Sequence, residues 1–249
     1  MTNISGNCEK SKRTFLHMMK KYSLGIVFIS MCLSAQSQAP VISNLPELNT
    51  FMQSDYHYKK NLKDMNKVIE GSPYLSDEFS TGSLIYQDTY YRNLQLRFNV
   101  YEGHFEFKSG DGFLYFDPRY TEVDTVWIGQ DKYVYAPYID NNREKRSYMH
   151  LLHDGNTKVL TLREKLLLRP EKAQGYEDAK PARFSEMTTR MFVSLEGEPA
   201  VEFSNRRSID VVFPESAKEL ESYAKKERLR FRSPDELVTL VEYYETLQK

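Results

Sequence analysis

Few residues of this sequence have the types and the spacing that metal binding requires. His150 and His153 form an H-x-x-H pair, which could share a metal ion on a helix or at a β-bulge. The residues around the pair indicate a strand, where side chains three apart point to opposite faces. No acidic residue nearby has an obvious ligand spacing, so we expect neither a metal site nor a cofactor.

The acidic residues give an equally weak signal for catalysis. Glu122 and Asp124 are two apart and would share one face of a strand, but the acid pair of a glycosidase usually comes from different strands. A solvent-facing polar stripe explains them as well. The sequence has no G-x-S-x-G elbow and no phosphate-binding glycine loop. We leave catalysis undecided and favour a protein that is not an enzyme.

Aromatic residues are the remaining candidates for binding. They are dense between residues 86 and 148, and aromatic side chains suit strands and fill the interiors of large sheets. Tyr101, however, falls on the polar face of its strand, and Trp127, Tyr133 and Tyr135 could share a face. We name these four as candidate ligand-binding residues, for a protein or a glycan, and expect most of the other rings in the core.

An export signal precedes the elements that would position these side chains. Two lysines, an apolar run from Leu24 to Leu33 and several small residues follow one another within residues 18–37, which is the order of a secretory signal peptide. The run is shorter than the roughly 20 residues that span a bilayer. We interpret the polar residues 1–17 as a spurious leader before the true start. The alternative is a real, unusually long n-region.

Processing would change both the cysteine content and the charge. We expect cleavage after Ser37, which removes Cys8 and Cys32 and leaves a mature chain without disulfides. A lipid anchor at Cys32 is not expected, because Met31 stands where a lipobox has a small residue. The net charge would fall from −1 to about −5, which argues against nucleic-acid binding, since that needs a basic face.

The mature chain divides into three zones. Residues 38–79 form a helical or irregular lead-in, residues 80–206 a β-rich zone, and residues 207–249 a pair of helices. In the second zone, apolar residues from Leu94 to Val100 alternate with polar ones, which is typical of a half-buried strand. Glycine turns such as Glu102-Gly103 recur between similar stretches. We predict a mainly β fold, an antiparallel meander that forms a sandwich or a curled, barrel-like sheet.

The C-terminal zone has the clearest helix signals. Ser233 can cap an N-terminus, Pro234 suits the first helical position, and Glu236 completes a capping box. An apolar stripe follows from Leu237 to Leu247, and a second amphipathic helix starts near Pro214. We expect these helices to form a hairpin that docks on the sheet, which gives an α+β protein overall.

Residues 71–79 (GSPYLSDEF) and the ending, from Phe213-Pro214 to Tyr243-Tyr244, carry a resemblance. Their order and spacing resemble a family of exported proteins of unknown function from Gram-negative bacteria, over nearly all of the mature chain. The resemblance implies export and supplies no catalytic or binding residue. Residues 71–79 themselves could be a binding loop, but we favour a structured crossing with Tyr74, Leu75 and Phe79 as plugs.

These observations favour a periplasmic or cell-surface interaction module that has no catalytic activity and binds a protein or a component of the cell envelope. The alternative is a carbohydrate-binding or glycoside-cleaving protein. Exposed aromatic rings beside two carboxylates about 5–9.5 Å apart would support that alternative. We expect no nucleic-acid partner and no membrane span after processing.

Overall fold

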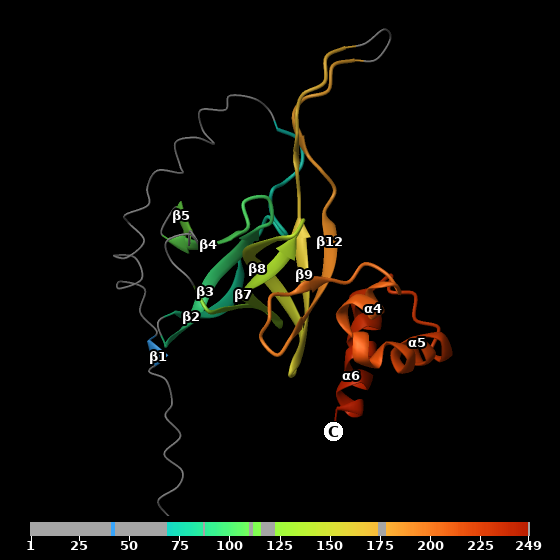
Figure 1. Cartoon of the computed structure of the whole chain (residues 1–249). Helices are drawn as coiled ribbons and strands as arrows, with labels where there is room; N and C mark the ends of the chain where they lie inside the picture. Colours follow the sequence, from blue (N-terminus) through green and yellow to red (C-terminus); the bar gives the residue numbers. More distant parts are fainter. Residues whose placement is uncertain are drawn as a thin grey trace, which may run out of the picture. The chain divides into compact units, whose positions relative to one another are not determined.

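The computed structural model describes residues 41–42, 69–86, 88–109, 112–115, 123–173 and 178–248 (Figure 1). The expected leader (1–17), the expected signal peptide (18–37) and most of the expected lead-in segment, up to residue 68, lie outside the described residues. The same holds for Glu122.

Ten strands form one antiparallel sheet in the part of the chain that the structure describes. In chain order they are β2 (Ser80–Tyr86), β3 (Thr89–Asn99), β4 (His104–Ser109), β5 (Gly112–Tyr115), β6 (Thr125–Ile128), β7 (Asp131–Asp140), β8 (Arg143–Asp154), β9 (Thr157–Glu164), β12 (Thr188–Leu195) and β13 (Val201–Glu202). A short strand β1 (Val41–Ile42) pairs in parallel with β3. The prediction of a mainly β, antiparallel fold is confirmed.

The chain builds the sheet in two directions from β2. Strands β3, β4 and β5 follow one another on one side of β2, and the chain then returns to place β6 on its other side. Strands β7, β8, β9, β12 and β13 continue outward from β6. Turns with positive φ join several neighbours, for example Gly103 between β3 and β4 and Gly197 between β12 and β13.

The sheet curls strongly but does not close into a barrel. Ala200, just before β13, exchanges backbone hydrogen bonds with Pro137 and Ile139 of β7, although three strands separate β13 from β7 in the sheet order. In the other half, Phe105 of β4 packs against Tyr133 of β7 and Tyr148 of β8, with ring centroids 5.3 and 4.9 Å apart. The curled form of the prediction is therefore the one that the protein adopts.

A bulge at Gly82 helps β2 to bend. The pairing of β2 with β3 shifts between Gly82 and Leu84, which is a place where a sheet twists more sharply. A Cβ atom at Gly82 would collide with the carbonyl oxygen of Trp127 and with the side chain of Leu96. Glycine is needed here because the neighbouring backbone approaches so closely.

A two-stranded arm leaves the sheet between β9 and β12 (Figure 1). Its strands are β10 (Leu167–Leu168) and β11 (Arg183–Phe184), which pair with each other. Glu70 runs beside the arm, donating its N–H to Ala182 and accepting the N–H of Phe184. The chain then enters residues 71–79, which hydrogen-bond to the end of β3 through Pro73 and Leu75.

Four short elements complete the fold: α4 (Ser208–Val212), the 3₁₀ helix η2 (Pro214–Ser216), α5 (Ala217–Lys226) and α6 (Pro234–Leu247). Leu220, Leu237 and Leu240 are fully buried, in a cluster that also contains Val159 of β9 and Val193 of β12. The apolar stripes of α5 and α6 therefore dock on the sheet, as expected from their periodicity.

The start of α6 is confirmed, but only one half of its predicted capping box forms. Ser233 occupies the cap position without a capping hydrogen bond from its side chain. The carboxylate of Glu236 accepts the backbone N–H of Ser233, as predicted, and also those of Arg230 and Arg232, at 3.3 and 2.7 Å. Phe231, between those two arginines, has a φ of 56°, and this bend turns the loop toward Glu236.

Candidate functional site

The four aromatic residues singled out in the sequence do not form one platform. Tyr133 is 1% exposed and lies in the core with the half-buried Tyr135. Tyr101, 39% exposed, sits at the β3–β4 turn and packs edge-on against Phe184 of the arm, with centroids 5.3 Å apart. Burial of Tyr133 contradicts its choice as a surface-binding residue, because its ring is a core residue, whereas Tyr101 is exposed, as its position in the strand suggested.

The expectation that Trp127 shares a face with Tyr133 and Tyr135 is wrong. Trp127 lies directly opposite Lys132 in the β6–β7 pairing, so it shares the face of Lys132, and Tyr133 points to the other face. The half-buried ring of Trp127 packs edge-on against Tyr90, 5.9 Å away. The register of this hairpin decides the outcome, and sequence alone does not fix it.

Tyr133 belongs to a polar cluster that joins β7, β8 and β9. Arg163 donates to the Tyr133 hydroxyl at 3.0 Å and to Nδ1 of His150 at 3.2 Å. Asp131 faces the same two residues, with its oxygens 3.5 Å from the Tyr133 hydroxyl and 3.5 Å from Nε2 of His150. The four side chains form a closed ring in which Arg163 donates and Asp131 accepts.

The protonation states follow from this geometry. Because a guanidinium can only donate, Nδ1 of His150 is an acceptor, and the proton of the neutral imidazole lies on Nε2, toward Asp131. Burial lowers the pKa of His150; Asp131 opposes this, and Arg163 adds to it. Burial raises the pKa of Tyr133 to about 12. Tyr133 therefore keeps its proton near neutral pH, and neither side chain offers a free base or nucleophile.

The depressed pKa of His150 predicts a pH-dependent contribution to stability. A neutral His150 contributes stability above its unfolded pKa, about 6.5, and this contribution is lost as the pH falls toward the folded pKa. We expect the free energy of unfolding to fall less between about pH 7.5 and pH 5 in His150→Gln than in the wild type. Urea titrations at both pH values measure this, and equal losses in the two proteins would contradict it.

His150 and His153 do not point to opposite faces of their strand, although their spacing had predicted this. The β8–β9 register shifts between Leu151 and His153, so that His150 faces Thr161 and His153 faces Val159. These partners are two apart, and the bulge therefore brings both histidines to one face, not to opposite faces as we predicted. They bind different partners, because His153 lies 3.2 Å from Glu245 of α6. Among the described residues, no group of three or more His, Cys, Asp or Glu side chains could hold a metal ion.

Glu245 fixes α6 to the β8–β9 hairpin. Its second oxygen accepts the N–H of Thr157 at 3.1 Å, and a Cβ atom at Gly155 would collide with this carboxylate. A hollow of about 600 Å³ opens beside this contact, with Tyr244, Glu196 and Glu198 among its lining residues. Because Glu245 is already bonded on both oxygens, this part of the hollow serves helix docking.

A second polar cluster lies under residues 71–79. The Arg97 guanidinium lies 2.6 Å from the buried Glu106 and donates to the Tyr74 hydroxyl at 2.8 Å. The rings of Tyr74 and Phe79 cover it, with centroids 3.7 and 4.4 Å from the guanidinium carbon. Tyr74 and Phe79, two of the three side chains expected to anchor residues 71–79, thus cover a buried ion pair. The third, Leu75, packs against the apolar core.

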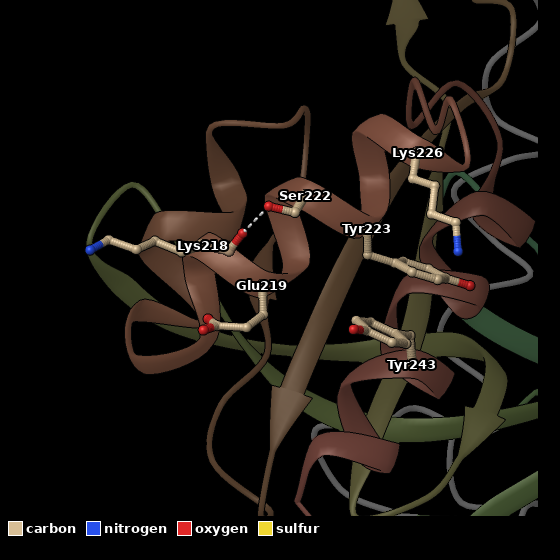
Figure 2. Close-up of a pocket in the computed structure, with 6 residues that line it drawn as sticks. All are labelled: Lys218, Glu219, Ser222, Tyr223, Lys226 and Tyr243. Carbon is tan, nitrogen blue, oxygen red and sulfur yellow. Dashed lines mark hydrogen bonds between the residues drawn. The ribbon is translucent and has the colours of Figure 1, made fainter.

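An open arrangement of aromatic and charged side chains lies on the helical hairpin. Tyr223 of α5 and Tyr243 of α6 stack with their centroids 3.8 Å apart and their planes 6° from parallel. They line a hollow of about 460 Å³ together with Lys218, Glu219, Ser222 and Lys226. Figure 2 shows Tyr223 lying over Tyr243, with Lys226 reaching down beside the Tyr223 ring. Protein interfaces are enriched in aromatic side chains and have a polar, solvent-accessible rim.

Sequence reasoning missed this hollow, although both tyrosines belong to the ending that carries the family resemblance. Their juxtaposition depends on the crossing of α5 and α6, which no local pattern reveals. None of the helices in the described residues is both long and apolar enough to cross a membrane. A scan against protein-family models and searches of curated proteins and of solved structures found no match to this chain.

Proposed function

We propose that this protein is an exported, non-catalytic interaction module and that its binding surface is the Tyr223–Tyr243 hollow on the α5–α6 hairpin. The observation that carries the proposal is the stacked pair itself, half-buried between two helices and rimmed by Lys218, Lys226 and Glu219. Interfaces concentrate binding energy in tyrosine, tryptophan and arginine side chains that sit in such partly closed surroundings.

The polar clusters of the sheet support a binding role over a catalytic one. In the ring around His150, and in the ion pair of Arg97 and Glu106, each polar side chain is bonded to another member of its own cluster. Catalysis needs a base or nucleophile within hydrogen-bond reach of a substrate. In these two clusters the bonds join strands of the sheet or cover a buried charge, and the two residues most often used as base or nucleophile, His150 and Tyr133, are largely buried.

A glycan-binding protein is the second candidate. The hollow combines aromatic rings with Ser222, Glu219 and Lys226, and sugars are bound by such rings together with polar side chains. Each tyrosine, however, already uses one ring face against the other, so a sugar could stack only on an outer face. This observation favours a protein partner, and a glycan array with Tyr243→Ala as the control separates the two candidates.

Photo-crosslinking tests the proposed function. A photoreactive residue replaces the exposed Ser222 at the rim of the hollow, and a control variant has it at the exposed Glu144 of β8. In intact cells of the source organism, we expect a discrete adduct from position 222 that disappears when Tyr243→Ala is added. Equal adducts from positions 222 and 144, or no adduct from either, would refute the proposal.

The export part of the proposal predicts the N-terminus of the mature protein. The apolar core of the signal and the small residues before the cleavage site place the first mature residue at Gln38. Mass spectrometry of the protein from the periplasm or the cell surface measures this directly. A diacylglyceryl group on an N-terminal Cys32 would show instead that the protein is a lipoprotein.

A further inference from the structure

The link between α5 and α6 is strongly basic and firmly held. Residues 225–232, here called the basic segment, contain five Lys or Arg residues and one acid, Glu227. Two buried side chains anchor it, Leu229 at 7% and Phe231 at 4% exposure. Phe231 packs edge-on against Phe203, with centroids 4.9 Å apart. The segment is therefore a fixed part of the surface.

Hydrogen bonds from outside the segment hold its backbone. Arg206 donates to the carbonyl oxygen of Leu229 at 3.0 Å, and the Glu236 carboxylate accepts two N–H groups of the segment. These N–H groups, that of Arg232 first, lower the pKa of Glu236 despite partial desolvation. Glu236, which faces the segment from α6, is thus held by backbone N–H groups; its charge offsets one of the five cations without forming an ion pair with any of them.

The cations of the segment are available. Lys225, Arg228, Arg230 and Arg232 are exposed, and within the described residues their side chains form no ion pair or hydrogen bond. Lys226 lies 3.8 Å from Glu227. Elsewhere, Arg97 and Arg190 are bound to carboxylates. Five cations held beside two carboxylates, Glu227 and Glu236, leave a net positive charge, which raises the local potential and attracts anionic groups.

The basic segment and the Tyr223–Tyr243 hollow are continuous, because Lys226 belongs to both. A ligand that spans them meets cations on one side and a hollow lined by two rings on the other. Guanidinium groups match carboxylates in a bidentate geometry. Among the described residues of the helical region, the exposed large hydrophobic side chains are Val211 and Leu247, and none lies in the basic segment or in the lining of the hollow, so this surface offers few of the apolar contacts with which a peripheral protein enters a bilayer.

We infer that this surface binds an acidic segment of a partner protein, whose carboxylates lie on the basic segment while one apolar side chain enters the hollow. The inference rests on the proposed function and gives the partner its chemistry. The charge complementarity of Arg228, Arg230 and Arg232 favours a polyanion, and the aromatic hollow favours a polypeptide over a lipid headgroup.

Peptide binding to the full chain tests the inference. The probes are short peptides in which Glu alternates with other residues around a single Leu or Phe, each paired with a copy that has Gln in place of Glu. We expect the acidic peptides to bind at least about tenfold more tightly than the Gln copies near 50 mM salt, and the difference to vanish near 500 mM. Fluorescence anisotropy measures both.

Two triple variants locate the site. Arg228→Ser/Arg230→Ser/Arg232→Ser should abolish the preference for acidic peptides. Arg143→Ser/Arg169→Ser/Lys172→Ser removes the same charge from exposed positions of β8 and the arm and should leave it intact. Tyr243→Ala should remove the preference for a peptide that contains Leu or Phe over one that contains Ala.

The outcomes separate this inference from the proposed function. No preference for the acidic peptides, equal effects of the two triple variants, or tighter binding to vesicles of anionic phospholipid would overturn the inference. If position 222 still crosslinks specifically in cells, the proposed function stands and only the partner's chemistry is wrong. If that crosslink is absent as well, both fail.

Discussion

Replacing Leu240 by alanine should lower the free energy of unfolding by about 2–5 kcal/mol, the usual cost of a cavity at a fully buried leucine. Leu240 is 0% exposed and lies in the cluster that joins the helices to β9 and β12. Leu240→Asp should be worse still, because a carboxylate would be buried there without a partner. Urea titration of the mature protein measures both.

Leu247 provides a matched control on the same helix. It ends α6 and is 40% exposed, so Leu247→Ala should change the free energy of unfolding by no more than about 0.5 kcal/mol. An unchanged Tm for both Leu240 variants would mean that α6 is detached from the sheet in solution. The binding surface would then lack the rigid support on which the proposed function depends.

Replacing Arg97 should lower the free energy of unfolding by a similar amount, because the buried carboxylate of Glu106 would lose its charged partner. Glu106 is 2% exposed, and Arg97 bonds it through Nε at 2.7 Å and through Nη2 at 2.6 Å. Arg97→Met leaves Glu106 buried with Asn99 and His104 as its remaining partners. Breaking a buried pair from one side costs about 3–5 kcal/mol, and Arg97→Met/Glu106→Met should recover much of that loss.

The pH dependence identifies the unpaired carboxylate as the cause. Burial raises the pKa of Glu106, but its bonds to His104 and Arg97 outweigh this, and the folded pKa is lowered. In the wild type, Glu106 therefore contributes stability above its unfolded pKa that is lost as the pH falls. In Arg97→Met the folded pKa should be raised, so the deficit should shrink from about pH 7 to about pH 5. A constant deficit, or the same deficit in the exposed control Arg92→Met, would contradict this explanation.

Local patterns in the sequence were enough to predict the strands and the C-terminal helices. The alternation from Leu94 to Val100 places Leu94, Leu96 and Phe98 in the core, and Pro234 begins α6. These features depend on neighbours within a few residues, where hydrophobic period and backbone preference act directly. The return of the chain from β5 to β6, beside β2, depends on long-range pairing and has no such signal.

The candidate sites depend on register and on helix crossing, which is why they were predicted less well. One extra residue at Leu152 brings His153 to the face of His150. The ring around His150 needs Arg163 from a third strand. Tyr223 and Tyr243 come from different helices, and although the hairpin was expected, the faces of α5 and α6 that meet in it were not. In each case the strand register or the way two helices cross decides which side chains meet, and the amino-acid composition does not determine either.

Covalent footprinting in intact cells tests most directly whether the helical hairpin is a binding surface. An amine-reactive reagent modifies exposed lysines, and mass spectrometry compares their labelling in cells with that in the purified protein. Lys218 and Lys226 line the hollow, whereas Lys172 is exposed on the arm and serves as the internal reference. If a partner covers the hollow, Lys218 and Lys226 should be protected in cells relative to Lys172. Equal labelling of all three lysines in cells and in the purified protein would contradict it.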